Sequence, residues 1–199
     1  MATLIKSIRL SGDMIKRVKK SEISFVPGIN LLIGPNGSGK TTFMDAMRDW
    51  RKSKNVEVKS NAGDFKAFSF EKDNPRTKPS GIATASSGDA VRSILALQMS
   101  SHGQTVQHII GYLGDDEIQD MLILLDEPEQ ALDTDGLETL IQLLKKTKAN
   151  QVIIATHSPF LILDPDFHIV ELEDGYRNKI KDSIISLASI CGTTTDVTV

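Results

Sequence analysis

The sequence lacks the features that mark disulfide-stabilised and membrane-spanning proteins. Its single cysteine, Cys191, has no partner for an intrachain disulfide or for a cysteine metal cluster, which fits a reducing compartment. No apolar run approaches the length of about 18 residues that a transmembrane helix needs, and residues 1–20 contain no signal-peptide core. We therefore expect a cytoplasmic protein without direct membrane insertion.

The chain also lacks a strong excess of charge, internal repeats and low-complexity segments. It carries 23 Lys and Arg against 26 Asp and Glu, so the chain as a whole is not attracted to nucleic acid. A basic run, Lys16, Arg17, Lys19 and Lys20, is more typical of a solvated hairpin face than of a binding patch, and both interpretations stay open. With 199 residues, 40% of them hydrophobic, we predict a single domain over residues 1–199.

The most informative stretch is a glycine-rich loop between an apolar run, 29–33, and a helical segment. Residues 34–42, GPNGSGKTT, match the phosphate-binding pattern G-x-x-x-x-G-K-S/T. Glycines let backbone N–H groups approach phosphate oxygens, Lys40 adds a charge near the β- and γ-phosphates, and the Thr41 hydroxyl can reach Mg²⁺. A glycine-rich turn without ligand is the alternative, which the flanking strand and helix disfavour. The sequence therefore predicts a nucleotide site at Asn36, Gly37, Ser38, Gly39, Lys40, Thr41 and Thr42.

Apolar strands alternate with helical segments along the rest of the chain. Residues 121–125 and 151–155 are apolar without alternation, which is typical of strands buried on both faces of a parallel sheet. Helical spacing is present over about 40–51 and 134–148, whereas 3–10 and 23–26 alternate as one-sided strands do, with a turn at 11–13 after the first. The sequence therefore predicts a three-layer α/β fold with a mainly parallel central sheet and an N-terminal antiparallel β portion.

Two carboxylates follow the apolar strand 121–125. An aspartate at the end of a buried strand, beside a phosphate loop, is typical of a Mg²⁺ ligand, so we predict that Asp126 shares the metal with Thr41. Glu127 comes next and can polarise an attacking water. Acidic residues also end strands as caps or solvated groups, and the phosphate loop is what favours the catalytic interpretation.

Several segments together resemble the ATP-binding-cassette (ABC) ATPases. They are GPNGSGKTT at 34–42, LILLDEPE at 122–129, ALD at 131–133 and THS at 156–158. The resemblance covers roughly residues 4–172. It implies the P-loop NTPase fold of ABC-ATPase type, with ATP and Mg²⁺ as cofactors.

The resemblance also implies a role for each matching residue. Lys40 binds phosphates, Thr41 and Asp126 bind Mg²⁺, and Glu127 is the general base. His157 resembles the switch histidine that contacts the γ-phosphate. Asp133 resembles a residue of the loop that crosses to a second subunit.

The family's signature, usually LSGGQ, has its nearest match in SSGDA at 86–90. In the family this segment binds the γ-phosphate of ATP on the opposite subunit, which implies that Ser87 and Gly88 complete a site in an ATP-dependent homodimer. A simple helix N-cap turn is the alternative interpretation.

Two departures from the family's pattern indicate which branch of the family the chain resembles. The distance from Lys40 to Ser87 is 47 residues (87 − 40), short beside both SMC coiled coils and the helical subdomain of transporter cassettes. We therefore expect a reduced helical subdomain at about 71–118. No Gln lies between Thr42 and Gly88, so the family's loop glutamine is missing, and Glu71 is a candidate replacement. The DEPE ending at 126–129 and the SSGD segment at 86–89 resemble the soluble RecF and overcoming-lysogenization-defect branch.

The biological role has three candidate forms at this point. The resemblance favours an ATPase that switches a nucleic-acid-related or defence partner, with DNA, a nuclease or a toxin as candidates. The alternatives are the nucleotide-binding subunit of a transporter with a separate permease, and a regulatory ATP-binding protein with little turnover. The sequence gives no second active site, because His102, His108 and His168 are not spaced as metal ligands.

Overall fold

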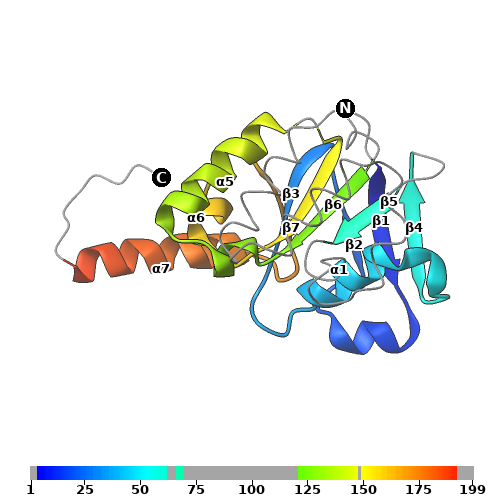
Figure 1. Cartoon of the computed structure of the whole chain (residues 1–199). Helices are drawn as coiled ribbons and strands as arrows, with labels where there is room; N and C mark the ends of the chain where they lie inside the picture. The colour runs from blue at the N-terminus through cyan, green and yellow to red at the C-terminus, as the bar shows by residue number, and fades with distance from the viewer. Residues whose placement is uncertain (1–3, 62–65, 70–120, 148, 192–199) are drawn as a thin grey trace.

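The computed structural model describes residues 4–61, 66–69, 121–147 and 149–191 (Figure 1). The predicted signature residues Ser87 and Gly88, the candidate Glu71 and the expected subdomain at 71–118 lie outside these ranges. Within them the chain forms two sheets, one of three strands and one of five, with helices packed against both.

The N-terminal part forms an antiparallel sheet in the order β2-β1-β4. Its strands are β1 (Ile5–Leu10), β2 (Glu22–Ser24) and β4 (Val56–Ser60). In β1 the side chains of Ile5, Ile8 and Leu10 are buried while Lys6 and Arg9 are exposed. This one-sided pattern is why the alternating sequence predicted the strand correctly.

The central sheet is parallel throughout and has the strand order β5-β6-β7-β3-β8. Its strands are β3 (Gly28–Ile33), β5 (Lys66–Ser69), β6 (Met121–Asp126), β7 (Gln151–Ala155) and β8 (His168–Glu171). Every residue of β7 is buried, as expected for a strand covered on both faces. Because all five strands run the same way, their carboxyl ends meet at one edge.

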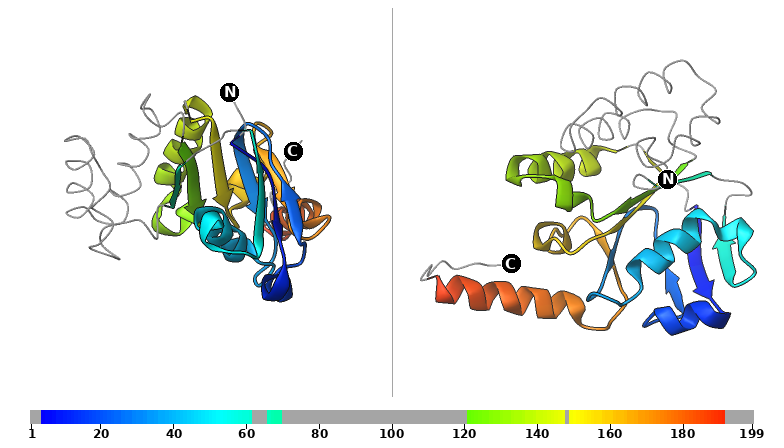
Figure 2. Two further views of the ribbon diagram at one scale, coloured as in Figure 1. Left: turned by 90° about the vertical axis from the view of Figure 1, so that its right-hand side faces the viewer. Right: turned by 60° about the horizontal axis from the view of Figure 1, so that its bottom comes forward.

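Helices cover both faces of the parallel sheet, which gives the three predicted layers (Figures 1 and 2). The helix α1 (Lys40–Arg48) lies between the two sheets and buries Phe43 and Met47. The helices α5 (Thr134–Lys146) and α6 (Pro159–Ile162) cover the other face with a second apolar cluster. The helix α7 (Tyr176–Ile190) packs its first turn on this cluster and then extends outward.

A buried amide joins the two sheets. The side chain of Gln151, fully buried at the start of β7, accepts a hydrogen bond from the Ile5 N–H at 2.8 Å. The same amide donates to the carbonyls of Ile5 at 2.9 Å and Val26 at 3.1 Å. Since the Ile5 backbone groups are shielded from water, the amide supplies them with partners that solvent cannot.

The structure corrects several predicted boundaries. The predicted turn at 11–13 belongs to a 3-10 helix, η1 (Gly12–Arg17), in which Lys16 pairs with Asp13 at 2.8 Å. The helix predicted over 40–51 ends at Arg48 and continues as a separate 3-10 turn, η2 (Trp50–Lys52). The helix predicted over 134–148 ends at Lys146.

Most of the basic run beside η1 is paired with acidic side chains. Lys19 lies 3.9 Å from a Glu173 carboxylate oxygen, and Lys20 donates to Asp174 at 2.5 Å. These contacts favour the solvated-face interpretation of the run. None of the described helices is long and apolar enough to cross a membrane.

Candidate nucleotide site

The phosphate loop connects β3 to α1 at the carboxyl edge of the parallel sheet. Two of its glycines, Gly37 and Gly39, have φ angles of +75° and +104°, which side-chain-bearing residues rarely adopt. A Cβ on Gly34 would lie 2.6 Å from the Ser38 hydroxyl, so the loop also needs a glycine there. The glycines predicted from the pattern therefore have a geometric reason in this chain.

The loop also packs against the segment between β1 and β2. A Cβ on Gly39 would lie 2.9 Å from the Arg17 carbonyl oxygen and from the Val18 Cα. The N–H of Lys19 donates to the Ser38 carbonyl at 3.0 Å. Residues 17–19 therefore pack directly against the phosphate loop, and this contact restricts how the loop can move.

Lys40 begins α1 and its side chain is almost fully buried. Its Nζ donates to the Gly34 carbonyl at 3.1 Å and lies 2.6 Å from Nε2 of His157. Burial lowers the pKa of Lys40, and the nearby carboxylates of Glu127, Asp126 and Glu129 oppose this shift. The ammonium therefore lies in a desolvated position where an added anion stabilises its charge.

Thr41 and Asp126 lie together, as predicted for a shared metal. The Thr41 hydroxyl donates to Oδ2 of Asp126 at 3.3 Å, joining the start of α1 to the end of β6. Both are hard oxygen donors, and Mg²⁺ prefers such donors. The described residues contain no group of three or more His, Cys, Asp and Glu that could bind a metal. This pair fits a Mg²⁺ ion that takes its remaining ligands from phosphates and water.

Glu127 has an unusual backbone conformation. Its φ of +51° makes it the one non-glycine residue with positive φ among those described. Its N–H donates to the Ala155 carbonyl at 2.7 Å, and Oε1 lies 3.3 Å from Nε2 of His157. The left-handed turn directs the chain away from β6, and this carboxylate lies beside the histidine and the lysine. Such strain is most frequent at functional sites.

His157 follows β7 and completes a cluster of three charged or titratable side chains. Its Nε2 lies within 3.3 Å of both Lys40 Nζ and Glu127 Oε1. The strands β3, β6 and β7 are neighbours in the sheet, so residues that are 117 positions apart in sequence meet at its edge. The structure thus brings together Lys40, Glu127 and His157, and their catalytic role stays a prediction.

Other predicted residues lie close by or have a structural role. Asn36 and Gly37 are exposed at the loop tip, and Thr42 is half-buried in the first turn of α1. Asp133 is the N-cap of α5, where its side chain accepts from the Gly136 N–H at 2.8 Å. It follows the 3-10 helix η5 (Pro128–Ala131), which begins directly after Glu127.

Sequence reasoning missed the role of Glu129. This residue served as a marker of the family branch, yet its carboxylate accepts hydrogen bonds from the His157 loop. The signal that could have indicated the role is a second carboxylate two residues after Glu127, facing the polar run that ends β7.

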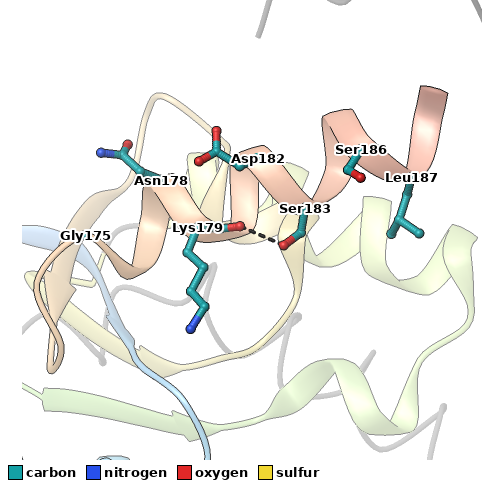
Figure 3. Close-up of a pocket in the computed structure, with 7 residues that line it drawn as sticks. All are labelled: Gly175, Asn178, Lys179, Asp182, Ser183, Ser186 and Leu187. Carbon is teal, nitrogen blue, oxygen red and sulfur yellow. Dashed lines mark hydrogen bonds between the residues drawn. The ribbon is translucent and has the colours of Figure 1, made fainter. Parts of the chain in front are cut away.

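A shallow hollow lies along α7, away from this cluster (Figure 3). One of its polar groups is already used, because the Ser183 hydroxyl donates to the Lys179 carbonyl at 2.8 Å. The hollow is formed by one face of one helix, so the phosphate loop remains the better candidate for the nucleotide site. Its lining residues are Gly175, Asn178, Lys179, Asp182, Ser183, Ser186 and Leu187.

Solved structures share this arrangement of strands and helices. A nucleotide-free ATP-binding cassette from an ABC transporter matches with a TM-score of 0.58 at 15% identity, over 94% of this chain and 98% of that chain. The ADP conformation of another transporter cassette matches with a TM-score of 0.53 at 14% identity, over 81% and 84%. The fold is that of an ABC-type P-loop ATPase. At such identities the likeness shows the fold alone.

Sequence comparison relates the chain to RecF. It is 32% identical over 95 residues to the DNA replication and repair protein RecF of Psychromonas ingrahamii, covering 43% of this chain and 26% of RecF. It is 46% identical over 39 residues to RecF of Vibrio vulnificus, covering 20% of this chain and 11% of RecF. The matches thus span about a quarter or less of these RecF chains.

A family model matches residues 96–164. Its description is "AAA domain, putative AbiEii toxin, Type IV TA system". The matched region includes the strand β6, the cluster residue Glu127 and the histidine His157. The chain is therefore similar over these residues to a described AAA-domain family.

Proposed function

We propose that the chain binds ATP with Mg²⁺ on the phosphate loop and hydrolyses it. The observation that supports this most is the meeting of Lys40, Glu127 and His157 at the carboxyl edge of the sheet. A cation, a carboxylate and an imidazole within hydrogen-bonding range, beside a glycine loop, suit phosphoryl transfer to water.

Each side chain has a distinct task in this mechanism. The loop amides and Lys40 bind the β- and γ-phosphates, and charge that develops there is stabilised by the desolvated ammonium. Glu127 orients a water for in-line attack and accepts its proton. His157 contacts the γ-phosphate in the space where it now meets Lys40. Thr41 and Asp126 would bind Mg²⁺, which supplies charge neutralisation to the phosphates when bound.

Hydrolysis is tested by comparing Mg-ATP turnover of the wild type with two variants. Lys40→Ala removes the phosphate-binding cation and Glu127→Gln removes the base while keeping its size. We expect both to reduce turnover by roughly 100-fold or more, since each removes a transition-state interaction. Wild-type turnover no higher than that of Lys40→Ala would instead indicate a regulatory ATP-binding protein.

We further propose that ATP joins two copies of the chain. The site would then be completed by Ser87 and Gly88 of the second copy, with Asp133 near the same interface. Glu127→Gln should accumulate as a dimer in Mg-ATP, because binding proceeds while hydrolysis does not. Light scattering of this variant with saturating Mg-ATP measures the mass directly, and a monomer would refute the proposal.

For the biological output we propose a switch acting on a nucleic-acid-related or defence partner. The similarity to RecF supports a DNA-related role, and the AbiEii description supports a defence role. DNA that raises ATP turnover at physiological salt would support the first. The alternative is the nucleotide-binding subunit of a transporter with a separate permease, which predicts no response to DNA and binding to a permease chain.

A further inference from the structure

The loop that contains His157 is bound by a single carboxylate oxygen. Oε1 of Glu129 accepts from the Thr156 hydroxyl at 2.6 Å, from the His157 N–H at 2.8 Å and from the Ser158 N–H at 3.1 Å. Three donors on consecutive residues thus converge on one atom. Hydrogen bonds to a charged acceptor are stronger than neutral ones, so this contact fixes the backbone on both sides of the imidazole.

The position of Glu129 is itself fixed by the turn after β6, which begins with Glu127. It lies in η5, two residues after Glu127, and its carbonyl accepts from the Leu132 N–H at 3.1 Å. The neighbouring Gln130 N–H donates to the Glu127 carbonyl at 3.1 Å. The carboxylate therefore connects the turn after β6 to the turn after β7, on which the imidazole lies.

The burial around the Glu129 carboxylate makes the loss of its hydrogen bonds costly. Its other oxygen, Oε2, is buried and has no hydrogen-bond partner among the described residues. Thr156 is fully buried and Ser158 nearly so. A buried carboxylate oxygen without a partner is costly, and the three donors on Oε1 offset that cost.

The imidazole depends on this backbone for its direction. His157 Nε2 meets Lys40 Nζ at 2.6 Å and Glu127 Oε1 at 3.3 Å, so a shift of about 1 Å in its backbone would break both contacts. Misplacement on that scale costs an enzyme roughly 100-fold in rate. We propose that Glu129 is the positioning residue for His157 in ATP hydrolysis. This inference rests on the proposed ATPase function.

A double-mutant cycle tests the inference. The variants are Glu129→Ala, His157→Ala and the double variant, with Glu138→Ala as control because Glu138 is exposed on α5. We expect Glu129→Ala to lower kcat for Mg-ATP roughly 10- to 100-fold, with KM changed by less than about 3-fold. In the His157→Ala background the same change should lower kcat by less than about 3-fold, because the residue it positions is gone.

Other results would overturn the inference. If Glu129→Ala turns over like the wild type, or lowers kcat equally in both backgrounds, the residue does not act through His157. If Glu129→Ala does not fold, Glu129→Gln replaces it in the cycle, since its amide oxygen still accepts but without charge. We expect Glu129→Gln to lower kcat by a smaller factor than the 10- to 100-fold expected for alanine, and to lower it still less in the His157→Ala background. An equal factor in both backgrounds would refute the role.

Failure of the ATPase proposal has a different signature. Wild-type turnover would then equal that of Lys40→Ala, and amide hydrogen exchange in the nucleotide-free protein would test the positioning by itself. We expect the His157 and Ser158 amides to exchange at least about 10-fold faster in Glu129→Ala or Glu129→Gln than in the Glu138→Ala control. Unchanged exchange would overturn the inference.

Discussion

The packing of residues 17–19 against the phosphate loop predicts that Gly39→Ala lowers the stability of the protein. Two effects add in this variant. The φ of +104° strains an alanine by about 1–2 kcal/mol, and the added Cβ meets backbone atoms of Arg17 and Val18 at 2.9 Å. Since ordinary van der Waals contacts begin near 3.4 Å, either the loop or residues 17–19 must move by about 0.5 Å (3.4 − 2.9). Overpacking of this kind costs about 1–3 kcal/mol.

Gly175→Ala is the matched control. Its φ is +79° and a Cβ there meets nothing within 4 Å, so it carries the strain without the clash. Both variants gain about 0.4–1 kcal/mol from the stiffer unfolded chain, which cancels in the comparison. We therefore expect Gly39→Ala to be less stable than Gly175→Ala by about 1–3 kcal/mol, or roughly 2–12 °C in Tm for a chain of this size.

Denaturant unfolding and ATP titration give the two readouts. The clash displaces the start of α1, so Gly39→Ala should also bind ATP at least about 10-fold more weakly, whereas Gly175→Ala should bind as the wild type does. Equal stability and equal ATP affinity of the two variants would refute the idea that the segment after η1 braces the loop.

Three further predictions concern single side chains. Because burial lowers the pKa of Lys40, binding of phosphate favours proton uptake by this lysine. ATP affinity should therefore fall as the pH rises through that lowered pKa towards the ordinary value of 10.5. Titration of ATP affinity across alkaline pH should show this fall in the wild type, and the fall should be absent in Lys40→Arg. Gln151→Leu removes the amide partner of the buried Ile5 N–H and carbonyl, whereas the Val26 carbonyl keeps the Asn30 amide at 2.8 Å, so the free energy of unfolding should fall by about 2 kcal/mol or more, as measured with urea. Asp133→Asn should keep the cap of α5 and its Tm, whereas Asp133→Ala should lose about 1 kcal/mol; an Asn variant that melts like Ala would contradict the cap role.

The sequence was most informative where one residue type alone satisfies the geometry. The glycines of the phosphate loop, the lysine after them and the apolar run before Asp126 were all predicted, and the structure places them at one edge of a parallel sheet. Strands with a clear pattern were predicted within about one or two residues because period and burial are coupled.

Side-chain contacts between distant segments could not be predicted in the same way. The carboxylate two residues after Glu127 is visible in the sequence, but which segment it binds is not, and neither is the bond of Gln151 to Ile5 across 146 residues. Helix ends were also missed, because the end of α1 depends on the conformation of Asp49 rather than on the apolar stripe. The prediction of Ser87 and Gly88 as a shared site remains a prediction.

The order of strands in the parallel sheet has a consequence for how the protein is made. β3, which presents the phosphate loop, pairs with β7 and β8, which lie more than 100 residues later in the chain. On the ribosome this apolar strand therefore emerges long before either neighbour exists. The phosphate loop can take its final shape only after β7 and β8 have emerged, so we expect folding to be slow and the nascent chain to need protection from aggregation.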